Sequence, residues 1–97
     1  MRSVHVSDVL AVARALRAVP EAQRQGLCAE MIREAELADR YMRRLGKPHP
    51  HWGNGTLRDT ARRRPMGDAL CFDDPQSCRC MAAVMHGLGI RPRSAHL

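Results

Sequence analysis

The sequence predicts an all-α protein, and three observations carry this prediction. Apolar residues recur every three to four positions in two segments, as on one face of a helix, and no segment shows sustained alternation of apolar and polar residues. Only Tyr41, Trp52 and Phe72 are aromatic among 97 residues, so the core has to be built from Leu, Val, Ala and Met. Finally, capping and helix-breaking residues flank each periodic segment. We expect one domain (1–97). It has three main helices at about 7–18, 20–45 and 75–87, a short helix at about 57–64 and a flexible tail at 88–97.

The first helix is predicted at about 7–18. Ser7 is a good N-cap residue, because its hydroxyl can accept a hydrogen bond from the first turn. The apolar residues that follow have helical spacing: Val9, Leu10, Val12, Ala13, Leu16 and Val19. Pro20 ends this helix and suits the first position of the next.

The segment 20–45 is predicted to be one long helix. Glu21 lies in its first turn and Arg43 and Arg44 in its last, where their charges favour the helix dipole. Gly46 is expected to form a left-handed C-cap. One stripe has a spacing close to that of a coiled coil, so it packs against neighbouring helices or against another subunit. The sequence leaves both alternatives open, and the stripe is the candidate oligomerisation seam: Leu27, Met31, Ala35, Ala38, Met42 and Leu45.

The second half of the chain is predicted to alternate loops and shorter helices. Residues 46–55, GKPHPHWGNG, are rich in turn-forming residues. Thr56 is a suitable N-cap for the helix at 57–64. The pair Asp74 and Pro75 fits the N-cap and first position of the last helix. We expect Gly87 to end that helix.

The positive charge is concentrated in the middle of the chain. The formal net charge is +6, and residues 46–66 hold five cations against one acid. Such a patch is typical of a protein that binds a polyanion, and it is equally compatible with an acidic protein surface. The candidate DNA-binding residues are therefore Lys47, Arg58, Arg62, Arg63 and Arg64.

Transmembrane and export signals are not expected from this sequence. No apolar run approaches the ~18 residues of a membrane-spanning helix. An acidic residue interrupts the N-terminal MRSVHVSD, and no apolar run follows it. We therefore expect a cytoplasmic protein.

Neither a cofactor nor a catalytic group is predicted. No phosphate-binding glycine loop and no nucleophile–base–acid order is found. The four cysteines do not have the spacing of common zinc sites, so reduced and mostly buried thiols are expected. A zinc-stabilised module remains an open alternative, with the ligands Cys71, Cys78, Cys80 and His86. Two further histidines, His49 and His51, are expected to stack or cap near Trp52 rather than to bind a metal.

One stretch resembles a known family. The stretch covers residues 27–61, and its central part, residues 30–61, reads EMIREAELADRYMRRLGKPHPHWGNGTLRDTA. This region resembles small proteins that are encoded beside the packaging genes of gene transfer agents in the Rhodobacter group of alphaproteobacteria. The family is regarded as the small terminase subunit. The resemblance is carried by Glu34, Ala35, Ala38, Asp39, Tyr41, Gly46, Pro50, Trp52, Gly53 and Gly55.

The resemblance implies a non-catalytic packaging protein. Small terminases are mostly helical, oligomerise through long helices and hand double-stranded DNA to the large terminase, which holds the ATPase and nuclease. A gene transfer agent packages host DNA without strong sequence choice, which fits the lack of a recognisable helix-turn-helix in this sequence. Position alone makes the last helix and the tail the candidate docking site for the large subunit. The alternative function is a small helical adaptor or regulatory protein that binds a protein partner and no nucleic acid.

Overall fold

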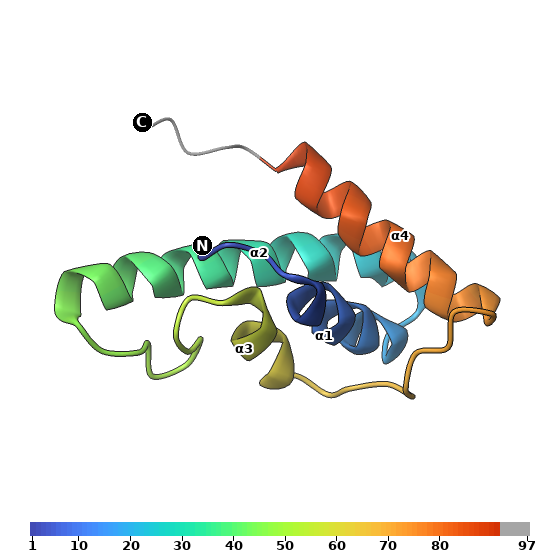
Figure 1. Cartoon of the computed structure of the whole chain (residues 1–97), viewed down its shortest axis with the longest axis horizontal. Coiled ribbons are helices and arrows are strands. Elements are labelled where there is room, and N and C mark those ends of the chain that lie inside the picture. Colours follow the sequence, from blue (N-terminus) through green and yellow to red (C-terminus); the bar gives the residue numbers. More distant parts are fainter. Residues whose placement is uncertain (92–97) are drawn as a thin grey trace.

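The computed structural model of the protein describes residues 1–91, and it confirms the all-α prediction. Within that range the chain forms no strand, only one isolated bridge between His49 and Gly53. Four helices follow one another along the chain (Figure 1): α1 (Val6–Arg17), α2 (Glu21–Leu45), α3 (Leu57–Arg62) and α4 (Pro75–Ile90). The helix boundaries lie within a few residues of those predicted. Of the predicted tail, residues 88–90 belong to α4, and residues 92–97 lie outside the described range.

The centre of the structure is α1. It packs against α2, α3 and α4, whereas α3 and α4 do not contact each other. Figure 1 shows the long α2 running across the molecule, with α1 and α3 along one side and α4 crossing near its start. Because α1 has neighbours on three sides, most of its residues are buried, among them Val12, Ala13 and Leu16.

The core is aliphatic and made largely of small side chains, as the composition predicts. No aromatic ring belongs to the buried cluster formed within residues 1–91. Alanines and cysteines let the helices approach closely, and this close approach fills the space that larger side chains would otherwise occupy. Helices α2, α3 and α4 contribute Cys28, Met31, Ile32, Ala35, Leu57, Ala61, Cys80 and Val84.

The predicted oligomerisation seam lies mostly inside the chain's own core. Met31, Ala35 and Ala38 are fully buried by neighbouring elements. Leu27 and Met42 are half-buried, and Leu45 is 52% exposed at the end of α2. The coiled-coil spacing of the stripe thus serves packing within the chain, and its three central residues are not accessible to a second subunit in this conformation.

The beginning of α1 differs from the prediction. The N-cap is His5 rather than Ser7, because the Asp8 carboxylate, and not the serine hydroxyl, satisfies the first backbone donors. Asp8 Oδ2 accepts a hydrogen bond from the backbone N–H of His5 at 2.8 Å. The other oxygen, Oδ1, accepts one from the backbone N–H of Arg58 at 2.8 Å. Asp8 thereby joins the N-termini of α1 and α3.

Polar contacts also join α1, α2 and α4. The buried Arg24 of α2 donates from Nε to the Leu16 carbonyl at 3.1 Å and from Nη1 to Gln76 Oε1 at 3.0 Å. As predicted, Asp74 caps α4, and its carboxylate also pairs with Arg17. The hydrogen bond from the Ser77 hydroxyl and the contact with Arg17 lower the pKa of the Asp74 carboxyl.

The end of α4 also differs from the prediction. The helix continues three residues beyond Gly87 to Ile90. Gly87 is needed for packing rather than for capping, since a Cβ at this position would lie 2.9 Å from Cys28 Sγ. The glycine therefore lets α4 cross α2 at short range. In the sequence alone, a glycine needed for such close packing cannot be told apart from a glycine that ends a helix.

The expectation of mostly buried thiols holds for only two of the four cysteines. All four are free, with Cys28 and Cys80 buried and Cys71 and Cys78 exposed. Burial raises the pKa of the Cys28 thiol to about 11 and also raises the pKa of the Cys80 thiol. In residues 1–91 no three His, Cys, Asp or Glu side chains form a group that could hold a metal ion, so the alternative zinc set is not brought together.

The chain has no membrane-spanning candidate in the part that the structure describes. None of its helices combines the length and the apolar character needed to cross a bilayer.

Replacing Gly87 with alanine tests the crossing of α2 and α4. We expect Gly87→Ala to lower the free energy of unfolding by about 1–3 kcal/mol, because the new methyl group overpacks against Cys28. Gly89→Ala is the matched control: a Cβ there has no neighbour within 4 Å, so the helix should gain up to about 1 kcal/mol. Urea unfolding measures both, and equal effects would contradict the close crossing.

Thiol labelling tests the burial of the cysteines. At pH 8 a pKa of about 11 leaves roughly one Cys28 thiol in a thousand ionised, and only the thiolate is nucleophilic. We therefore expect iodoacetamide to modify Cys71 and Cys78 in the folded protein, and Cys28 and Cys80 only after unfolding. Peptide mass spectrometry locates the labels. Rapid labelling of Cys28 in the native protein would show that the core is wrongly described.

Candidate nucleic-acid interface

Three of the five predicted DNA-binding cations are exposed and available. Lys47 follows the left-handed C-cap Gly46 of α2. Arg58 and Arg62 lie one turn apart on α3 and project to solvent. Within residues 1–91 none of these three forms a salt bridge. Their charges are therefore free to meet an anion.

The other two predicted cations are held by carboxylates. Arg64 Nη2 lies 2.6 Å from Glu34 Oε2 and 3.6 Å from Glu30 Oε1, and its side chain is largely buried. This pair joins the end of α3 to the middle of α2, so the assignment of Arg64 as a phosphate contact is revised. Arg63 Nη2 lies 3.5 Å from Asp59 Oδ2 but stays partly exposed, where such a pair is weak.

The loop between α2 and α3 is held in place by its histidine and its glycines. The His49 ring stacks on Trp52 at 4.6 Å and meets the edge of Tyr41 at 4.8 Å, as predicted for a structural histidine. Its Nδ1 accepts hydrogen bonds from the backbone N–H groups of His51 and Trp52. These contacts make the loop a support for the basic residues beside it.

Gly55 brings the end of this loop directly onto α2. Its φ of +92° is in the left-handed region, and a Cβ would lie 2.8 Å from the Asp39 Cα. The Gly55 carbonyl also accepts a hydrogen bond from the Arg2 backbone N–H at 3.1 Å. The N-terminal segment, the loop and the end of α2 are thereby brought together.

A basic cleft forms where these three segments meet. It is open, has a volume of about 520 Å³ and is lined by two arginines, a histidine and two hydroxyl-bearing residues: Arg2, Ser3, His5, Arg43 and Thr56. Guanidinium and hydroxyl groups are the donors that proteins use to contact phosphate oxygens. The cleft is therefore suited to an anionic group.

Arg2 and Arg43 were not predicted as binding residues, although the sequence holds a signal for Arg43. The segment 20–45 has no net charge, but its acids all lie at or before Asp39. Residues 40–47 carry four cations and no acid. Averaging over the whole helix conceals this gradient. Arg2 joins the cleft only through folding, and no sequence pattern indicates it.

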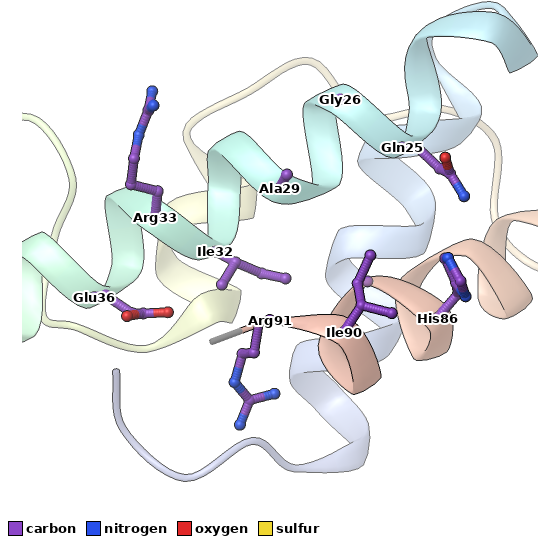
Figure 2. Close-up of a pocket in the computed structure, with 10 residues that line it drawn as sticks. Gln25, Gly26, Ala29, Ile32, Arg33, Glu36, His86, Ile90 and Arg91 are labelled. Carbon is purple, nitrogen blue, oxygen red and sulfur yellow. The ribbon is translucent and has the colours of Figure 1, made fainter. Parts of the chain in front are cut away.

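A second surface lies between α2 and α4, on a different part of the molecule. This groove has a volume of about 580 Å³, and its lining is mostly apolar. Figure 2 shows Ile32 of α2 and Ile90 of α4 projecting toward the space between the two helices, with Glu36 and Arg91 beside it and Arg33 directed away from α4. An apolar groove of this kind is suited to another protein segment rather than to DNA.

Replacing Arg64 tests the revised role of this residue. We expect Arg64→Gln to lower the free energy of unfolding by roughly 1–3 kcal/mol, because it leaves the buried Glu34 carboxylate without its ionic partner. The control Arg62→Gln removes an exposed charge and should change stability by less than about 0.5 kcal/mol. Thermal unfolding compares the two variants. If Arg64→Gln left the stability unchanged, Arg64 would again count among the cations that are free to contact phosphate.

Comparison with known proteins places the chain in one family. No curated protein and no solved structure matches it significantly. A family model described as a domain of unknown function, DUF7742, matches residues 2–88. This match includes α1, α2, α3, the part of α4 up to residue 88 and every residue of the basic cleft. The chain therefore belongs to the DUF7742 family.

Proposed function

We propose that this protein is a non-catalytic small terminase subunit that binds double-stranded DNA and presents it to a large terminase for packaging into a phage-like particle. The observation that carries the proposal is the concentration of exposed cations around the basic cleft. The likeness of residues 30–61 to gene transfer agent proteins supplies the packaging context. On this proposal the protein acts in the cytoplasm as a homo-oligomer.

The placement of acids supports binding of a polyanion. At the end of the molecule that holds the cleft, the carboxylates are turned inward or paired. Asp8 binds two backbone N–H groups, and Asp39 is buried against Arg43 and the amino group of Met1. Glu34 and Asp59 are paired with Arg64 and Arg63, as described above. The outward charge is thus positive, although acids are numerous in the sequence.

The shape of the surface supports binding without sequence preference. Sequence is read by side chains that reach base edges in a groove, whereas phosphate contacts carry no sequence information. The helix α3 has six residues, and its outward arginines, Arg58 and Arg62, suit phosphates. The cleft residues themselves belong to the N-terminal segment, the end of α2 and the start of α3 at Thr56. Such phosphate contacts are sufficient for a protein that binds the DNA backbone without reading the bases.

A second function, as an adaptor for a protein partner, is favoured by the apolar groove between α2 and α4. An apolar groove can accept a segment of another protein, whereas the proposed DNA contacts lie at the cleft. Partner binding at the groove and DNA binding at the cleft use different residues, so variants can separate them.

DNA affinity measured as a function of salt tests the proposed function. We expect Arg2→Gln/Arg43→Gln and Arg58→Gln/Arg62→Gln each to weaken binding of a short duplex roughly tenfold at low salt. Each pair should also reduce the slope of log K against log salt by about 2, because two phosphate contacts are lost. Fluorescence anisotropy with duplexes of two unrelated sequences provides the measurement.

The control variant is Arg33→Gln/Arg79→Gln, which removes the same charge from the α2–α4 side of the molecule. It should leave the salt slope nearly unchanged. An equal loss in the control would show that net charge alone drives binding. A wild-type protein that did not bind DNA at moderate salt would overturn the proposal and leave the adaptor function.

A further inference from the structure

The groove between α2 and α4 has a shallow floor on its α2 side. Gly26 and Ala29 line it and project almost no side chain, so the α2 backbone is accessible there. A neighbouring helix can approach such a surface more closely than the usual 8–10 Å between helix axes. The floor is thus shaped to receive a side chain or a helix from outside.

Packing within residues 1–91 does not explain Gly26. A Cβ at this position would meet no atom within 4 Å, in contrast to Gly87 on the facing helix. Its backbone is helical, so no left-handed conformation requires a glycine. A glycine inside a helix is destabilising relative to alanine. Residues 1–91 therefore leave this part of the groove floor open.

The same surface carries a protruding apolar side chain. Ile90 of α4 lines the groove and is nevertheless 68% exposed. Residues of opposite sign also line the groove, with Arg91 positive and Glu36 negative. A partner with one sign of charge would be repelled by part of this rim, whereas a second copy presents both signs.

We propose that the groove is a two-fold interface with a second copy of this chain. In such a contact each surface meets itself, so a protrusion and its receiving site must lie on one face. Ile90 of each copy occupies the Gly26–Ala29 floor of the other, and the mixed charges at the rim pair across the axis. The inference rests on the oligomeric part of the proposed function and assigns its surface, which the buried seam of α2 does not provide.

The native mass in solution, measured by light scattering on a sizing column without DNA, tests this interface. We expect the wild-type protein to have twice the mass of the 10.9 kDa chain. Ile90→Glu places a charge in the interface, and Gly26→Gln fills the floor, so each should raise the dimer dissociation constant at least tenfold and yield monomers. Val6→Glu is the matched control, because Val6 is 74% exposed and lies away from the groove.

Measurements of folding and of DNA binding on the same variants distinguish failure of the interface from failure of the proposed DNA binding. Gly26 is exposed, and a Cβ there meets no atom of residues 1–91 within 4 Å, so the Gly26→Gln variant should retain its helical circular dichroism and cooperative unfolding. A monomeric wild-type protein, or an assembly whose mass neither groove variant changes, would overturn the interface. A dimer that the groove variants dissociate, but that does not bind DNA, would overturn the proposed DNA-binding function and support the interface.

Discussion

The structure depends on the buried carboxylate of Asp8. One oxygen satisfies the backbone at the start of α1, and the other accepts the Arg58 N–H at the start of α3. A helix as short as α3 is not stable on its own, so it needs such external contacts. The burial of Leu57 and Ala61 against α1 adds to them. Since α3 carries two of the exposed arginines, the position of the basic surface depends on Asp8 together with this apolar packing.

Much of the fold could be predicted from local signals, and the errors have identifiable causes. The four helices were predicted because their periodicity, proline positions and N-caps agree, as with Asp74 before Pro75. The start of α1 was misplaced because Asp8 and Ser7 are both good N-terminal residues, and only the contact with α3 favours the carboxylate. Gly87 was interpreted as a helix end because a glycine required for close packing looks the same in sequence as one required for capping.

The candidate site was less predictable, because it depends on contacts between distant segments. A run of arginines predicts a basic patch, but it does not show that Arg64 pairs with Glu34, which is 30 residues earlier. The cleft includes Arg2 because the N-terminal segment lies on the loop at Gly55. The stripe on α2 has the spacing of an oligomer seam, and the same spacing serves a helix that covers its own core. These distinctions require the tertiary structure.

The central claim is that one end of the molecule binds the DNA backbone while the groove of α2 and α4 stays free of it. Titration of ¹⁵N-labelled protein with a short duplex, followed by NMR, tests this claim most directly. The account predicts chemical-shift changes in the first five residues and in the last turns of α2 and α3. The residues of the α2–α4 groove should show no changes. Changes centred on Ile32 and Ile90, or no changes at saturating DNA, would contradict it.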